Sequence, residues 1–192
     1  MKTLIINGSP KKDGDTAALI KEFSRHLQGE VLEISHFNGI SPCNDCRYCW
    51  ENDGCVIDDD MQRIYSYLEE CDNLVLASPV WFSSVSGPLL NIASRLQTYF
   101  AARFFRDAGD QMCHKNSVLI FAGAEPGTER SAEVTAKIIL KQANALPCAA
   151  FVKAMNTNEI PAAHDASALA GARNAALLLN EFATLFPAPS NG

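Results

Sequence analysis

The sequence lacks long apolar runs, an excess of basic residues, internal repeats and low-complexity linkers. No apolar run approaches the roughly 20 residues of a membrane-spanning helix, and the first apolar stretch is too short for a signal peptide. Because 22 acidic residues outnumber 16 basic ones, the chain has no long-range attraction for nucleic acid or an anionic membrane. We therefore expect a cytoplasmic protein with neither kind of partner, in which any phosphate is bound locally.

The composition is that of a folded domain. Hydrophobic residues make up 47% of the 192 residues and charged residues 20%, a balance that excludes a disordered chain, a collagen and a coiled coil. We predict a single domain over residues 1–192. It carries a cysteine-rich insertion at about residues 36–57, the cysteine segment.

Short apolar runs alternate with helical patterns along the chain. The runs predict strands at residues 3–7, 30–35, 73–77, 117–123 and 147–154. Pro79 is expected to end the third of these strands. Amphipathic patterns predict helices at about 15–27, from 58 onward, at 87–105 as one long helix, at 130–145 and at 166–185. Strands separated by helices predict a parallel sheet covered on both faces, the doubly wound α/β architecture. We interpret the aspartates at 58–60 as a solvated helix cap and expect the tail after Phe186 to be loosely ordered.

Ligands of an open parallel sheet bind outside the carboxyl ends of its strands, which draws attention to the turn after the first strand. This turn, GSPKKDGDT at residues 8–16, leads into a helix N-terminus. The hydroxyls of Ser9 and Thr16, Lys11, the free backbone N–H groups and the helix dipole can together hold a phosphate. It has neither the GK[ST] of a Walker loop nor a GxGxxG turn, which disfavours NTP hydrolysis and ordinary dinucleotide binding. An ordinary polar turn with a capping Asp or Thr remains the alternative.

The segments after the third and fourth strands are also unusual. Residues 79–83, PVWFS, place Trp81 and Phe82 at a strand end, where exposed rings suit a flat ligand unless they fill the core beneath the next helix. Residues 122–127 are small and glycine-rich, so the backbone can approach a ring system, although a generic turn explains them equally well.

Three motifs in order, GSPKKDGDT, CNDCRYCWENDGCVIDDDM and SPVWFSSVSGP, resemble the flavodoxin-like NAD(P)H-dependent FMN reductases, in particular their iron–sulfur flavoprotein branch. The resemblance covers the chain to about Ser94. It implies a flavodoxin-like three-layer sandwich whose five-stranded parallel sheet has the order 2-1-3-4-5.

The resemblance also implies which residues bind FMN. The phosphate would be held by Ser9, Lys11, Asp15, Thr16 and the Ala17 backbone. The flavin ring and ribityl chain would contact Pro79, Val80, Trp81, Phe82 and Ser83, with Gly123 on the other side of the ring. The family usually has Asn at the position of Asp15, and a carboxylate there repels a phosphate unless it points away or caps the helix.

Four of the seven cysteines lie in one stretch of thirteen residues inside the cysteine segment, namely Cys43, Cys46, Cys49 and Cys55. Their C-x2-C-x2-C run, followed by a fourth cysteine after Gly54, resembles ferredoxin-type ligation of a [4Fe-4S] cluster. A zinc site with four cysteines, or four free or partly oxidised thiols, are the alternatives. The three remaining cysteines, at 71, 113 and 148, are expected to be buried as small hydrophobic residues.

The resemblance implies an FMN-dependent oxidoreductase with no catalytic acid or base of its own. NAD(P)H, or a ferredoxin-like donor if the cluster is present, would supply electrons, and a small molecule would accept them. The alternatives are a flavodoxin-like electron carrier without a substrate site and a non-redox module whose cysteine segment is organised by zinc. Tyr99, Phe100, Phe104 and Phe105 either roof the core or form the interface of a homodimer or homotetramer.

Overall fold

The computed structural model describes residues 1–109 and 111–185, so the expectation for the tail after Phe186 lies outside the described residues. The main sheet consists of β1 (Lys2–Asn7), β2 (Glu30–Ser35), β3 (Asn73–Trp81), β5 (Asn116–Gly123) and β6 (Ala150–Met155). These five strands are parallel and lie side by side in the order β2-β1-β3-β5-β6. This order confirms the predicted flavodoxin-like arrangement. The short β4 (Ser84–Val85) pairs antiparallel with the end of β3.

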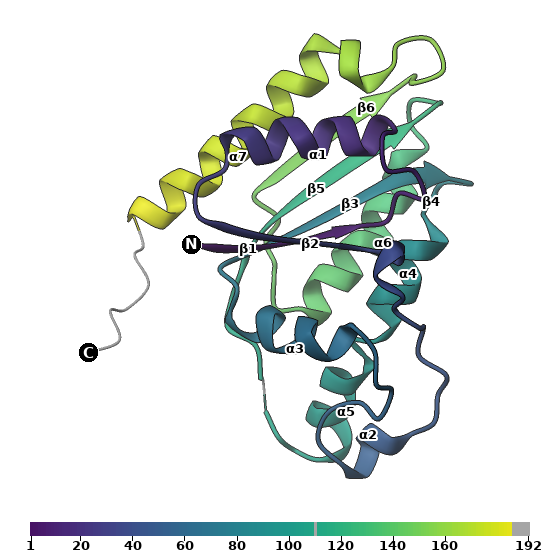
Figure 1. Ribbon diagram of the computed structural model, residues 1–192, viewed down its shortest axis with the longest axis vertical. Helices are drawn as coiled ribbons and strands as arrows, with labels where there is room; N and C mark the ends of the chain where they lie inside the picture. Colours follow the sequence, from purple (N-terminus) through teal and green to yellow (C-terminus); the bar gives the residue numbers. More distant parts are fainter. Residues whose placement is uncertain (110, 186–192) are drawn as a thin grey trace.

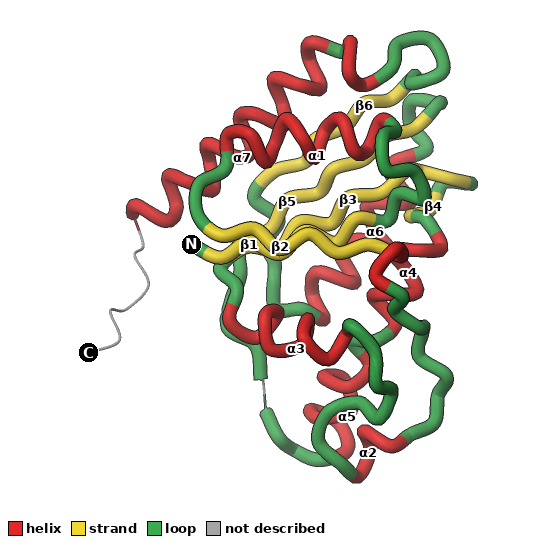
Figure 2. The backbone as a smooth tube through the Cα atoms, in the orientation of Figure 1, coloured by secondary structure: helices red, strands yellow, loops and turns green. Residues whose placement is uncertain are grey.

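Helices cover both faces of the sheet (Figure 1), and in Figure 2 the helices, drawn red, lie on either side of the yellow strands. One face carries α1 (Asp15–His26) and α7 (Ala166–Leu185); the other carries α3 (Met61–Glu70), α4 (Gly87–Ser94) and α6 (Glu129–Gln142). Beyond the second layer, α5 (Gln97–Phe105) lies beside α2 (Tyr48–Glu51) of the cysteine segment. Two 3-10 turns, η1 (His36–Asn38) and η2 (Ala162–His164), complete the regular structure. Among the described helices, none combines the length and the hydropathy that crossing a membrane requires.

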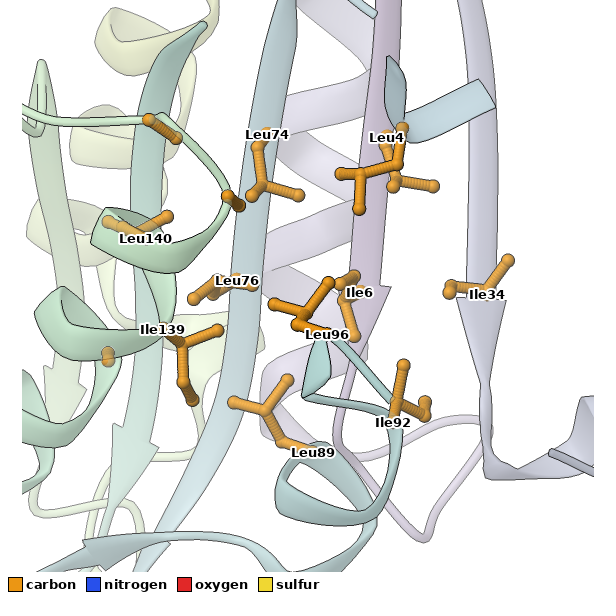
Figure 3. Packing of buried hydrophobic residues seen from close by; sticks show 14 of the residues in the cluster. Leu4, Ile6, Ile34, Leu74, Leu76, Leu89, Ile92, Leu96, Ile139 and Leu140 are labelled. Atoms are coloured by element: carbon orange, nitrogen blue, oxygen red, sulfur yellow. The ribbon is translucent and has the colours of Figure 1, made fainter. Parts of the chain in front are cut away.

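Alternate residues of each central strand face opposite helix layers. Leu4 and Leu76 belong to the same buried layer as Leu89 of α4 and Leu140 of α6 (Figure 3). Ile5 and Val75 pack toward α1 and α7. Because both faces are buried, the strands read as continuous apolar runs, which is why the sequence predicted them closely.

The predicted single helix from Gly87 toward Phe105 is wrong, because the chain breaks into α4 and α5 at Arg95 and Leu96. At the break, the Arg95 and Leu96 N–H groups donate to carbonyls only three residues back, which tightens the turn. The side chain of Arg95 is buried at this point. The apolar spacing continues across the break, so the pattern alone did not reveal it.

Pro79 does not end β3, which continues to Trp81. The Ala77 carbonyl accepts from Gly8 on the β1 side, so the Pro79 nitrogen, two residues on, faces that same side beyond the end of β1. The missing N–H therefore costs the sheet no hydrogen bond. β3 and β4 then form a hairpin whose two turn residues, Phe82 and Ser83, both have left-handed backbone conformations, with φ of 50° and 58°.

The aromatic residues of α5 divide between the core and the surface. Tyr99 is buried and donates its hydroxyl to Glu69, so it roofs the core. Phe104 is 67% exposed, and Phe105 stacks on Trp50 of α2 with ring centroids 4.1 Å apart. This stacking fixes α2 against α5.

Candidate functional site

The turn after β1 is ordered by its own polar groups. The Ser9 N–H donates to Asn7 Oδ1, the Ser9 hydroxyl donates to the Lys11 carbonyl, and the Lys11 N–H donates back to Ser9 Oγ. Gly8 is needed for a close approach to α4, because a Cβ there would lie 2.6 Å from Ser86 Oγ and 2.7 Å from Leu89 Cβ. The turn therefore has a fixed place between the sheet and the start of α4.

The start of α1 fits an anion. Its N-cap is Gly14, and no side chain of the described residues caps it. The first N–H groups of the helix, at residues 15–17, have no carbonyl of the helix to bind, and they carry the positive end of the helix dipole. Phosphate is the kind of group that such an unfilled helix start holds.

One carboxylate oxygen of Asp15 has a partner outside the turn. Its Oδ1 accepts the Ala162 N–H at 2.7 Å, which ties the start of α1 to η2. One carboxylate oxygen is therefore held by η2, while Asp15 still lines the cavity described below.

The β3–β4 hairpin presents its two aromatic rings differently. Trp81 is 46% exposed, whereas Phe82 at the tip is fully exposed. Neither ring fills the core, which rules out that alternative. Gly123, at the end of β5, lies so close to Met155 and Val80 that a Cβ would be 2.6 Å from Met155 Cε and 3.3 Å from Val80 Cβ.

These segments enclose a cavity of about 300 Å³ at the carboxyl ends of β1, β3, β5 and β6. Of the predicted FMN residues it brings together Ser9, Lys11, Asp15, Thr16, Pro79, Val80, Trp81 and Gly123. Ala17 instead lines a neighbouring groove, and Phe82 and Ser83 form the hairpin tip outside the cavity wall. The volume is within the range of small-ligand sites, about 300–1,000 Å³.

The residues predicted to bind FMN leave out six others of the wall. Pro10, Gly14, Ala122 and Ala124 lie in segments that the sequence did single out, whereas Thr157 and Asn158 do not. The last two follow β6, whose carboxyl end meets the same edge as the other strands. The Asn156 and Thr157 N–H groups both donate to the Gly123 carbonyl, at 2.8 and 3.0 Å. Applying the strand-end rule to the fifth strand would have found this segment.

A larger groove of about 700 Å³ runs along α1. Charged side chains of both signs line it, including Lys21, Arg25, Glu22 and Glu33. Most of its wall comes from one helix, whereas four strand ends converge on the smaller cavity. We therefore take the smaller cavity as the candidate FMN site.

A separate pocket gathers all four predicted metal-binding cysteines, Cys43, Cys46, Cys49 and Cys55. Left-handed residues at Asp45, Arg47 and Gly54 turn the chain around the pocket. The Cys43 N–H donates to Ser94 Oγ at 2.9 Å, which attaches the segment to the end of α4. The other wall is formed by Arg95, Gln97 and Thr98.

The four thiols are close enough to influence one another. Burial raises the pKa of Cys49, and the negative charges of the Cys55, Cys43 and Cys46 thiolates raise it further. Within residues 1–109 and 111–185, no group of three or more His, Cys, Asp or Glu side chains is gathered tightly enough to hold one metal ion. A tetrahedral zinc site would place its sulfur atoms about 4 Å apart. An iron–sulfur cube separates its thiolates more widely, because iron and sulfide atoms lie between them.

Asp59 is more than a solvated cap. Its Oδ1 accepts the Met61 N–H at the start of α3, while its Oδ2 accepts the Ser41 N–H and pairs with Arg95 at 2.6 Å. Burial alone would raise the pKa of Asp59, but these hydrogen bonds and the Arg95 charge bring it below its ordinary value. The sequence offered no sign of a partner 36 residues away.

The three remaining cysteines are not all buried. Cys71 is buried, which raises the pKa of its thiol to about 12, and Cys148 is half-buried. Cys113 is exposed, contrary to the prediction, in the segment that leads into β5. Beside it, the Lys115 ammonium is fully buried and donates to the Cys113 carbonyl at 2.7 Å.

The family model for NADPH-dependent FMN reductases matches residues 1–157. The chain belongs to this family. The matched span contains the cysteine segment and the wall of the candidate FMN site as far as Thr157.

Two kinds of curated relatives are similar to this FMN reductase family member. An iron–sulfur flavoprotein of Methanocaldococcus jannaschii is 33% identical over 99 residues, which cover 50% of this chain and 51% of the relative. A putative NAD(P)H-dependent FMN-containing oxidoreductase of Bacillus subtilis is 25% identical over 125 residues, covering 65% of this chain and 68% of the relative. The chain thus spans about half the length of the iron–sulfur flavoproteins it matches.

Solved structures confirm the fold. The NAD(P)H:quinone oxidoreductase of Methanothermobacter marburgensis superposes with a TM-score of 0.70 at 15% identity, over 93% of this chain and 96% of that one. The apo form of an NADH:FMN oxidoreductase superposes with a TM-score of 0.64, also at 15% identity, over 98% and 92% of the two chains. At this identity the likeness concerns the arrangement of strands and helices.

Proposed function

We propose that the protein is an FMN-dependent oxidoreductase that takes electrons from NAD(P)H and delivers them to a small-molecule acceptor. One observation carries the proposal. Segments from four strand ends converge on a cavity that has an uncapped helix start on one side and a half-exposed indole on the other. That pairing suits a ligand with a phosphate at one end and a planar ring at the other.

Each part of the cavity has a defined role in this proposal. The N–H groups at the start of α1, together with Lys11, hold the FMN phosphate, and Trp81 contacts the ring. Gly123 brings the backbone of β5 to the cavity wall, because the place of its missing side chain is taken by Met155 and Val80. Bound FMN supplies the chemistry, accepting hydride from a nicotinamide and passing electrons on. The chain therefore contributes position and charge, and no residue acts as catalytic acid or base.

We further propose that Cys43, Cys46, Cys49 and Cys55 hold a [4Fe-4S] cluster. Four thiolate donors around one pocket are the ligand set of such a cluster, which supplies single-electron transfer when bound. The two sites are connected by α4. Ser86 at its start donates to the Gly8 carbonyl of the phosphate turn, and Ser94 at its end accepts from Cys43. Eight helical residues span about 12 Å.

The remaining features of the proposal concern the whole protein. Residues 1–192 form one FMN-binding domain with the cysteine segment as an insertion, in a cytoplasmic protein that assembles into a homodimer or homotetramer. The exposed Phe104 on α5 supports an interface on that side. A ferredoxin-like protein would be a second electron donor, entering at the cysteine segment.

Anaerobic purification tests both cofactors together. The absorption spectrum and assays for flavin, iron, sulfide and zinc should give one FMN with about four iron and four sulfide per chain. NADPH or NADH added without oxygen should then bleach the flavin absorbance. A flavin that neither nucleotide bleaches would identify an electron carrier instead, and zinc without iron or flavin would identify a non-redox module. FMN without iron would leave a plain reductase and remove the cluster from the proposal.

A further inference from the structure

The break between α4 and α5 buries a charged side chain beside the cysteines. Arg95 has no exposed side-chain surface and is the largest fully buried side chain among the described residues. Burying a guanidinium is costly unless its donors are matched by acceptors. The contacts that Arg95 makes should therefore indicate why the chain accepts this cost.

All hydrogen bonds from the Arg95 guanidinium go to residues at the two ends of the cysteine run. Nη1 donates to the Ser41 carbonyl at 2.9 Å and to Asp59 Oδ2 at 2.6 Å, and Nη2 donates to the Ile57 carbonyl at 3.3 Å. Ser41 lies two residues before Cys43, and Ile57 two residues after Cys55. Arg95 thus fastens the entry and exit of the cysteine run to each other and to α4.

One donor of Arg95 has no acceptor. Nε is buried and makes no hydrogen bond to any described residue, although its neighbours on the guanidinium are all engaged. Arg95 also lines the pocket that contains the four cysteines. A buried, charged N–H group without a partner is destabilising, so an acceptor is expected where the pocket lies.

Charge supports the same assignment. A [4Fe-4S] cluster with four thiolate ligands carries a net negative charge, which grows by one when the cluster is reduced. Asp59 offsets the charge of Arg95 but accepts only from Nη1, which leaves the Nε–H dipole unopposed. Hydrogen bonds to the sulfur atoms and nearby positive charge are two of the factors that set the reduction potential of such clusters.

We propose that Arg95 is a positioning residue that closes the cysteine run and donates its Nε–H to a sulfur atom of the cluster, thereby raising the cluster's reduction potential. This inference rests on the proposed cluster site. Reduction adds one electron from an external reductant to the cluster, while Arg95 keeps its proton throughout. Asp59 lowers the reduction potential, because its carboxylate charge disfavours the reduced state.

A redox titration followed by electron paramagnetic resonance tests the proposal on anaerobically reconstituted protein. Arg95→Gln should lower the ratio of reduced to oxidised cluster at a fixed potential by about tenfold, equivalent to a shift of about 59 mV to more negative values for one electron. Asp59→Asn keeps an acceptor for Nη1 but removes a negative charge, so its shift should be to more positive values. Arg95→Lys, which keeps the charge without the Nε donor, should lie between wild type and Arg95→Gln.

Arg106→Gln is the matched control. Arg106 pairs with Asp53 of the cysteine segment and is also largely buried, but it does not line the cysteine pocket, so its loss should shift the potential much less. Opposite shifts for Arg95→Gln and Asp59→Asn support the proposal, because mere loosening of the segment would move both in one direction. Unchanged potentials, or equal shifts at Arg95 and Arg106, overturn it while leaving the cluster in place. Wild-type protein that binds no iron overturns the cluster site and this inference together.

Discussion

The candidate FMN cavity is framed by the ends of four hydrogen-bonded strands, whereas the cysteine pocket is framed by an irregular segment and the break between two helices. The sheet fixes the first site through many backbone hydrogen bonds. The second depends on few contacts, among which the buried Arg95–Asp59 pair connects three separate stretches of chain. The groups around the first site are thus held in place by the whole sheet, whereas those around the second depend on single side chains.

The largest expected effect is at the buried pair. Asp59→Ala leaves the Arg95 charge uncompensated and should lower the free energy of unfolding by about 3–5 kcal/mol, measured by urea denaturation. Glu70→Ala, which removes the partner of the exposed Lys2, is the control and should change stability little. Similar losses in the two variants would mean that the cysteine pocket does not depend on its ion pair.

A smaller effect is expected where the phosphate turn meets α4. Gly8→Ala places a Cβ against Ser86 and Leu89, and such overpacking should lower the free energy of unfolding by about 1–3 kcal/mol. Gly87→Ala is the matched control, since a Cβ there meets nothing within 4 Å. Thermal and urea unfolding of both variants would measure the difference. A Gly8→Ala variant as stable as Gly87→Ala would show that Ser86 and Leu89 can move aside for a methyl group.

The two aromatic residues of the hairpin should differ in FMN binding. Trp81 lines the cavity and Phe82 does not, so Trp81→Ala should weaken FMN binding about two- to tenfold while Phe82→Ala leaves it unchanged. Both side chains are exposed enough that neither variant should lose much stability. Flavin fluorescence titration of the apo protein gives the dissociation constants. Equal affinity in wild type and Trp81→Ala would remove the indole from the site.

The smallest expected effect is a pH dependence at the cysteine pocket. Since folding lowers the pKa of Asp59 from its ordinary 3.8, the stability that this carboxylate contributes is complete above that value and is lost as the pH falls through the lower folded pKa. The difference in the free energy of unfolding between wild type and Asp59→Asn should therefore begin to shrink as the pH falls below about 4 and go on shrinking toward pH 3. Unfolding curves from pH 7 to pH 3, without added iron, would show it. A difference that stays constant over this range would contradict the charge pairing.

The sequence predicted the sheet closely and the irregular parts poorly, for physical reasons. Strands such as β1 are buried on both faces, so their apolar runs are strong signals. The break at Arg95 was missed because it depends on Asp59, a partner distant in sequence. The β3–β4 hairpin was missed because Phe82 and Ser83 adopt left-handed conformations that usually require Gly or Asn.

The candidate site divides in the same way. The turn at residues 8–16 and Trp81 could be located because they follow strand ends and differ in composition from an ordinary turn. Which of their neighbours join the cavity depends on the direction of each side chain, and Phe82, adjacent to Trp81, points away from it. The resemblance to FMN reductases suggested which ligand binds, and the fold supports this suggestion because segments from four strand ends line one cavity.

A crystal structure of the protein with bound FMN would decide between the two cavities next to α1. The phosphate should lie within hydrogen-bonding distance of the N–H groups of Thr16 and Ala17, with the ring against Trp81. Density for FMN in the groove lined by Lys21 and Arg25, or no binding at the strand ends, would contradict this placement.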